Sequence, residues 1–230
     1  MNQKFAIIGL GLFGSSIART LAERGAEVIA IDIKLARVEA IKDDVAHAVC
    51  LDATDAKALV GQNIHEVDAV VVAIGEDFEC LLLASVHLLE LKVKRLISRA
   101  ANAQQRMILE KVGVKEVLSP EATVGKTVAE TLLHPSIHTS LPLSDEYEIV
   151  EINTPKRVTN QTIREIGLRE RYNLNLITVK RKFEKEEEGE RKEIYKVIGV
   201  PQPETKLEDN DILILLGKVP DVDKFVESNQ

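Results

Sequence analysis

Short apolar runs alternate with helical patterns along residues 1–135. The runs at 4–10, 28–32 and 67–74 are apolar at nearly every position, as expected for parallel strands that are buried on both faces. Between the first two runs, Phe13, Ile17 and Leu21 recur at helical spacing. Further strands are expected at 47–51, 95–98 and 117–118, and further helices at 35–43, 55–63, 77–91, 103–112 and 121–133. This order predicts an α/β fold with a Rossmann-like, doubly wound parallel sheet.

The pattern changes after residue 135. Residues 136–146 contain Ser, Pro and Thr with little periodicity, so we expect a linker there. Residues 147–230 resemble a small α+β domain instead. Its strands are expected at 147–152, 174–179, 195–200 and 212–216, and its helices at 162–168 and 220–226. Residues 182–192 are highly charged, which favours a solvated hairpin loop, with a partner-binding patch as the alternative.

Three glycines follow the first expected strand. Gly9 permits a tight turn, Gly11 lets the backbone approach a phosphate, and Gly14 lets the following helix pack against the strand. The helix start offers free N–H groups to an anion. Asp32 ends the second strand about 18 residues after Gly14, where a carboxylate accepts hydrogen bonds from ribose hydroxyls. This series predicts a dinucleotide or nucleotide site, and the acid disfavours the 2′-phosphate of NADP. Three turn glycines in an ordinary α/β domain are the alternative.

Composition narrows the class of protein. The net charge of −7 argues against general nucleic-acid binding. No apolar stretch reaches the roughly 20 residues that span a bilayer, and the N-terminus runs straight into a strand, so we expect no signal peptide. Cys50 and Cys80 lie in apolar surroundings and are expected to be buried thiols of a reduced cytosol.

Catalysis finds no support in the sequence. A dehydrogenase needs a proton-transfer group beside the nicotinamide, yet the C-terminal region has neither a His–Asp pair nor a Tyr-x-x-x-Lys pair. The expectation is therefore nucleotide binding without an enzyme activity. A small NAD-dependent oxidoreductase or redox sensor is the alternative. A transcription regulator is a third reading, but no helix-turn-helix or basic patch supports it.

Several motifs together resemble a known family. They are Ile8-Gly9-Leu10-Gly11-Leu12-Phe13-Gly14, Asp52-Ala53-Thr54-Asp55, Val72-Ala73-Ile74-Gly75, Arg99-Ala100-Ala101-Asn102 and Ser119-Pro120-Glu121. They resemble the RCK (KTN) regulatory subunits of Ktr and Trk potassium-uptake systems. The C-terminal region is similar to the companion RCK-C (TrkA-C) lobe, notably Leu168-Arg169 through Tyr172 and Leu174-Asn175-Leu176.

The resemblance implies a cytoplasmic, non-enzymatic gating subunit with a Rossmann-like RCK N-lobe and a small α+β RCK-C lobe. Such subunits form homodimers that assemble into an octameric ring. The ring sits at the inner face of the membrane, under a KtrB- or TrkH-like potassium pore subunit. The implied ligands are adenine nucleotides (ATP, ADP or AMP) or NAD(H).

The resemblance also implies roles for individual residues. Gly9, Gly11 and Gly14 would hold the phosphates, and Asp32 the ribose. Glu121 would lie near the phosphates of a neighbouring subunit and help to hold a cation; an acid favoured by the helix dipole is the alternative. The rest of the implied site is Leu12, Phe13, Ile33, Lys34, Asp52, Ala53, Thr54, Ile74, Gly75 and Arg99, with Asp52, Ala53 and Thr54 bordering the adenine, Ile74 and Gly75 at the crevice, and Arg99 neutralising phosphate charge.

Two further points follow from the resemblance. Close Ktr relatives often carry Arg where this chain has Leu12, and a Leu side chain cannot pair with phosphate. The C-lobe of Ktr-type relatives can bind cyclic di-AMP, and the residues that fall at that site are Ile163, Arg169, Asn175, Leu176 and Pro201. A surface Arg and a turn Asn are the alternative interpretation.

Overall fold

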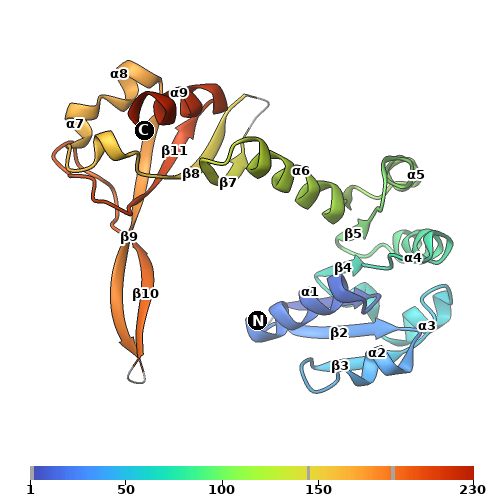
Figure 1. Cartoon of the computed structure of the whole chain (residues 1–230). Helices are drawn as coiled ribbons and strands as arrows, with labels where there is room; N and C mark the ends of the chain where they lie inside the picture. Colours follow the sequence, from blue (N-terminus) through green and yellow to red (C-terminus); the bar gives the residue numbers. More distant parts are fainter. Residues whose placement is uncertain (1–2, 144–145, 188–189) are drawn as a thin grey trace. The chain divides into compact units, whose positions relative to one another are not determined.

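The structure is a computed structural model that describes residues 3–143, 146–187 and 190–230 (Figure 1). The chain divides into two compact units, an N-terminal unit (Met1–Thr123) and a C-terminal unit (Val124–Gln230). The division falls inside helix α6 (Pro120–Leu133). Among the described residues, each helix is too short or too polar to cross a membrane.

The N-terminal unit is built on a six-stranded parallel sheet with the strand order β3-β2-β1-β4-β5-β6. Its strands are β1 (Lys4–Ile8), β2 (Glu27–Asp32), β3 (His47–Cys50), β4 (Ala69–Val72), β5 (Leu96–Arg99) and β6 (Glu116–Leu118). The connecting helices are α1 (Leu12–Glu23), α2 (Leu35–Glu39), α3 (Ala56–Gly61), η1 (Ile64–Glu66), α4 (Phe78–Glu90) and α5 (Ala103–Val112). The doubly wound parallel sheet expected from the sequence is confirmed.

The apolar strands are explained by two cores, one on each face of this sheet. Successive residues of β1 alternate between them, since Ile7 belongs to one core and Ile8 to the other. Val70 and Val71 of β4 do the same. Because both faces are covered, nearly every position of a central strand is apolar. The strand β1 pairs with both β2 and β4, so the chain order reverses there and opens a crevice at the carboxyl ends of the strands.

The C-terminal unit contains a five-stranded antiparallel sheet with the order β10-β9-β11-β8-β7. Its strands are β7 (Ile137–Pro142), β8 (Glu148–Asn153), β9 (Asn175–Glu187), β10 (Glu190–Val197) and β11 (Ile212–Gly217). Its short helices are η2 (Lys156–Val158), α7 (Ile163–Ile166), α8 (Leu168–Tyr172) and α9 (Val219–Asn229). Burial alternates along β11, so one face of the sheet packs on a core that includes Phe225 and Ile152. The small α+β lobe expected from the sequence is confirmed.

Two segments that were expected to be irregular contain strands. Within the expected linker, Ile137–Pro142 form strand β7, because they pair with β8 and bury Ile137. The charged segment expected as a solvated hairpin loop does lie in a hairpin, but its residues form the paired ends of β9 and β10, apart from residues 188–189, which lie outside the described residues. Its charges are compatible with strands because they pair across the ribbon: Lys182 Nζ lies 2.6 Å from Glu193 Oε1.

Candidate functional site

The turn after β1 is shaped by two glycines that leave no space for a side chain. Gly9 has φ +95°, and a Cβ there would lie 2.8 Å from the Ile74 backbone nitrogen. A Cβ on Gly14 would lie 1.9 Å from the Gly9 carbonyl oxygen. Gly11 differs, because no described heavy atom lies within 4 Å of its Cβ position. Gly9 and Gly14 are therefore required for packing, and Gly11 leaves open space in front of the turn.

Helix α1 begins at this open space. Its N-cap is Gly11, which supplies no side-chain hydrogen bond to the first turn. The N–H groups of that turn and the positive end of the helix dipole are therefore available to an anion. Leu12, the first helical residue, is 97% exposed. The only contribution of Leu12 to an anion site is thus its backbone N–H.

Asp32 fixes the opposite side of the turn. Its carboxylate is buried at the end of β2, with 5% of the residue exposed. Oδ2 accepts a hydrogen bond from the Leu10 N–H at 2.7 Å, and Oδ1 accepts one from the Lys34 N–H at 2.8 Å. These bonds hold the carboxylate at one position and leave further acceptor capacity on both oxygens. The geometry suits a carboxylate that accepts ribose hydroxyl groups.

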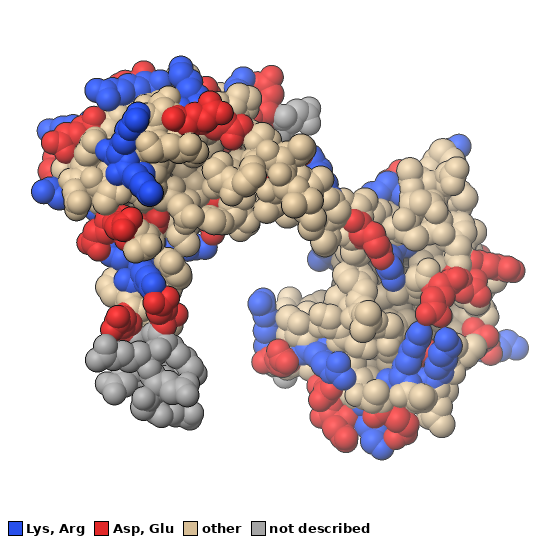
Figure 2. Space-filling view, viewed as in Figure 1, with Lys and Arg blue, Asp and Glu red and all other residues tan. Residues whose placement is uncertain are grey.

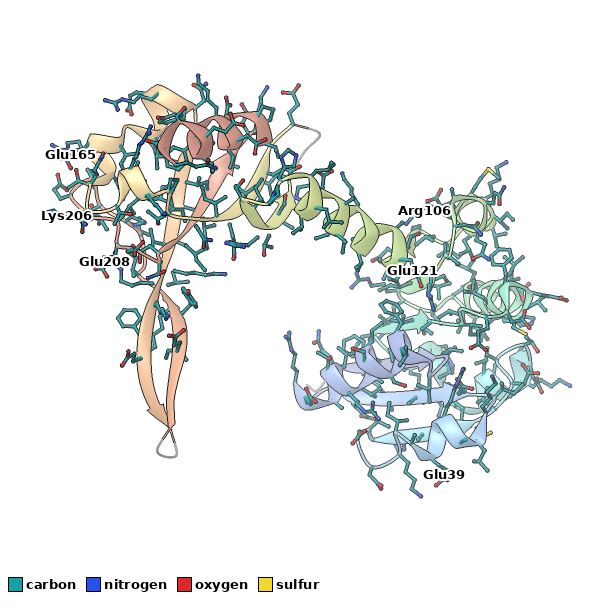
Figure 3. All side chains as sticks on the ribbon, in the orientation of Figure 1. Glu39, Arg106, Glu121, Glu165, Lys206 and Glu208 are labelled. Atoms are coloured by element: carbon teal, nitrogen blue, oxygen red, sulfur yellow. The ribbon has the colours of Figure 1, made fainter. Side chains whose placement is uncertain are left out.

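Arg99 reaches the crevice from the end of β5. Its guanidinium lies 5.9 Å from the centroid of the Phe13 ring and pairs with Glu121. Figure 3 labels Glu121 at the start of α6. A Cβ on Gly75 would lie 2.2 Å from Arg99 Nη1, so any larger residue at 75 would move the guanidinium from this position. The buried Arg99 Nε has no hydrogen-bond partner among the described residues, which is unusual for a buried donor.

Glu121 is charged in this arrangement. A hydrogen bond from its own backbone N–H is the main cause that lowers the pKa of the Glu121 carboxyl; desolvation opposes this effect, and the pairing with Arg99 lowers the pKa further. Within the described ranges 3–143, 146–187 and 190–230, there is no group of three or more His, Cys, Asp or Glu residues that could hold a metal ion. The cation role of Glu121 stays a prediction.

These side chains surround one cavity of about 820 Å³ at the carboxyl ends of the strands. Fourteen of the fifteen expected N-lobe residues line it, and Gly14 lies behind the turn. The cavity is also lined by residues that the sequence analysis did not assign to the site: Arg37, Glu76, Asp77 and Cys80, together with the strand-end residues Ile8, Ile31, Leu51 and Ala73. The site residues are thus brought together, and their individual binding roles stay predictions.

The cysteines differ from the expectation of buried thiols. Cys50 is exposed and donates a hydrogen bond to the Ile33 carbonyl oxygen at 3.4 Å. Cys80 is half-buried at the cavity wall. A hydrogen bond with Asp77, followed by desolvation, raises the pKa of the Cys80 thiol. Because the thiolate is the reactive form, this environment suppresses nucleophilic or redox chemistry at Cys80.

A second, smaller cavity of about 370 Å³ lies in the C-terminal unit. All five residues expected for the second ligand line it: Ile163, Arg169, Asn175, Leu176 and Pro201. Arg169 Nε donates to Asn175 Oδ1 at 2.9 Å, so these two polar side chains are held together at the cavity.

Comparisons with known proteins define the class. Residues 5–120 match the TrkA-N domain family, and residues 147–229 match the TrkA-C domain family. The chain is 33% identical over 225 residues to Ktr system potassium uptake protein C of Bacillus subtilis (strain 168), covering 98% of this chain and 96% of that protein. It is 30% identical over 224 residues to Ktr system potassium uptake protein A of the same organism, covering 97% and 96%.

A solved structure shares the fold. The GsuK channel bound to NAD matches 100% of this chain and 39% of its own, with a TM-score of 0.59 and 18% identity. These findings confirm the resemblance seen in the sequence motifs. The chain therefore belongs to the family of two-domain TrkA-N/TrkA-C proteins that includes the Ktr system potassium uptake proteins.

Proposed function

We propose that this chain is a nucleotide-binding regulatory subunit of a Ktr-type potassium uptake system. The observation that carries the proposal is the single cavity in which a free helix N-terminus, the buried Asp32 carboxylate and the Arg99 guanidinium converge. An anion-binding helix end beside a ribose-binding carboxylate suits an adenine nucleotide or NAD(H). Family membership supports a regulator and not a dehydrogenase.

The phosphates would lie between Gly11, the first turn of α1 and Arg99, and the ribose at Asp32. The adenine would lie at Asp52–Thr54, where Asp52 Oδ1 accepts hydrogen bonds from the Thr54 N–H at 2.9 Å and the Thr54 hydroxyl at 2.7 Å. Glu121 would contribute to a cation site only together with phosphate oxygens or a second subunit, because its described partner is Arg99.

The proposal includes assembly and location. The subunit would act as a homo-oligomer, a dimer that builds an octameric ring, at the cytoplasmic face of a membrane potassium pore subunit. Positive and negative side chains are intermingled on the visible surface of the N-terminal unit (Figure 2), which fits a protein partner better than nucleic acid. A nucleotide would shift the ring only by binding one ring shape more tightly than another. The C-terminal cavity is a candidate site for cyclic di-AMP.

Thermal denaturation with ATP, ADP, AMP and NAD(H) tests nucleotide binding. A ligand at about one hundred times its Kd adds about 2.7 kcal/mol to the free energy of unfolding, so the midpoint should rise by several degrees. Asp32→Ala should abolish this rise. Asp44→Ala, which removes an exposed carboxylate paired with Arg19, is the matched control and should preserve it. An unchanged ligand-induced shift in Asp32→Ala would contradict the assigned site.

A further inference from the structure

Two cations flank the carboxylate that the proposed function assigns to the ribose. Arg37 Nη1 lies 3.5 Å from Asp32 Oδ2, on the side of the carboxylate that faces α2. Its Nη2 lies 3.3 Å from Glu76 Oε1, and Lys34 Nζ lies 3.4 Å from Glu76 Oε2. All four residues line the large cavity. One carboxylate from the loop after β4 thus bridges two cations from the segment that follows β2.

This bridge is easily displaced. The Glu76 side chain is 76% exposed, the Lys34 side chain 56% and the Arg37 side chain 34%. Ion pairs at these distances in solvent contribute little to stability. Lys34 first, and then Arg37, lower the pKa of Glu76, so it is an anion at neutral pH. Glu76 therefore occupies a position that another anion could take.

The charge of Asp32 is largely satisfied from within the protein. Its two oxygens accept the Leu10 and Lys34 backbone N–H groups, and Arg37 lies beside them. A lone carboxylate at the end of β2 would repel a phosphate on the ribose. A nearby Arg is the usual means by which this fold accommodates a 2′-phosphate, and a guanidinium matches phosphate in charge and geometry.

We infer that the ribose end of this cavity accepts a 2′-phosphate, which Arg37 and Lys34 bind in place of Glu76. The inference rests on the proposed function and widens its ligand class to 2′-phosphorylated adenine nucleotides, including the NADP(H) type. It revises the expectation, drawn from Asp32 alone, that such ligands are excluded. Arg37 determines this specificity, because it contacts both Asp32 and Glu76.

A matched pair of nucleotides tests the inference. AMP and adenosine 2′,5′-bisphosphate differ only by the 2′-phosphate, and calorimetry of the full chain measures the Kd of each. The wild type should bind the bisphosphate at least as tightly as AMP. Arg37→Ala should weaken the bisphosphate about tenfold, as expected for one charged hydrogen-bonded pair, and AMP less than about threefold. Arg37→Lys should recover part of the loss, and Glu76→Gln should tighten the bisphosphate.

The controls separate the inference from the proposed function. Arg19→Ala removes another exposed guanidinium, paired with Asp44 outside the cavity, and should change neither Kd. If AMP binds and the bisphosphate binds more weakly than AMP, this inference alone is overturned. Equal weakening of both nucleotides by Arg37→Ala would also overturn it, because Arg37 would then act only on the adenosine part. Absence of binding by either nucleotide would overturn the proposed function as well.

Discussion

Leu12 occupies the first position of α1 at the mouth of the cavity, with its side chain in solvent. Leu12→Arg should therefore be tolerated by the fold and should add a guanidinium beside the nucleotide phosphates. We expect the affinity for ADP or ATP to rise about tenfold, measured by calorimetry, with the midpoint of the free protein unchanged. Leu12→Gln, which adds a polar side chain without charge, is the control. An unaltered affinity in Leu12→Arg would place the phosphates away from the start of α1.

Changing Gly14 to alanine should lower the stability of the fold, whereas changing Gly11 to alanine should lower the affinity for nucleotide. Gly14→Ala forces a methyl group against the Gly9 carbonyl oxygen, and such overpacking costs about 1–3 kcal/mol. Gly11→Ala meets open space and a φ of −70° that alanine adopts, so stability should hold while nucleotide binding falls. Urea denaturation and calorimetry measure the two effects. Equal loss of stability in both variants would contradict this division of roles.

The residues that could be predicted from the sequence are those whose spacing along the chain is fixed by the chemistry. Gly9, Gly11, Gly14 and Asp32 belong to one strand–turn–helix–strand unit, so their order alone indicates a site. Arg37 and Glu76 could not be found this way. Arg37 follows β2 and Glu76 follows β4, and these two strands flank β1, so the side chains meet across the crevice at the end of β1. No local sequence pattern predicts this contact.

At the scale of elements, the charged ribbon of β9 and β10 shows where the sequence misleads. Dense charge usually indicates solvated loop, yet Lys182 and Glu193 pair across the strands, and Phe183 lies opposite Ile194. Beyond Lys180, β9 has β10 as its sole strand neighbour among the described residues. Charged residues lie between the apolar ones, so this segment lacks the strict apolar–polar alternation of a half-buried strand. Its strands could therefore not be predicted from the sequence.

Shortening this ribbon should leave the C-terminal unit folded. We expect that replacing Phe183–Ile194 by an Asn-Gly turn changes the thermal midpoint by less than about 2 °C, because the described core of this unit contains no residue of the deleted segment. Asp211→Ala is the comparison. Asp211 is 1% exposed and accepts two hydrogen bonds from Arg181 at 2.9 and 2.8 Å, and breaking such a buried pair costs about 3–5 kcal/mol. Unfolding of the shortened variant would show that the ribbon is needed for the C-terminal unit to fold.

At the scale of the whole molecule, helix α6 carries an apolar row that the single chain leaves in solvent. None of its residues is buried, and Val124, Val128 and Leu132 are exposed at intervals of one helical turn. The proposed homo-oligomer would cover this row. Light scattering should give an assembly larger than a dimer, and Val128→Asp should lower its mass. A monomer at all concentrations would remove the proposed ring.

The ribbon of β9 and β10 is also the segment that a protease should cleave first. Figure 1 shows β9 and β10 continuing away from the rest of their sheet, and a two-stranded ribbon in water opens readily. Lys182 and Lys196 lie on it, so trypsin should nick the protein there before the cores are attacked. Because β11 pairs with both β8 and the first part of β9, the two fragments should stay together in native solution and separate only in denaturant.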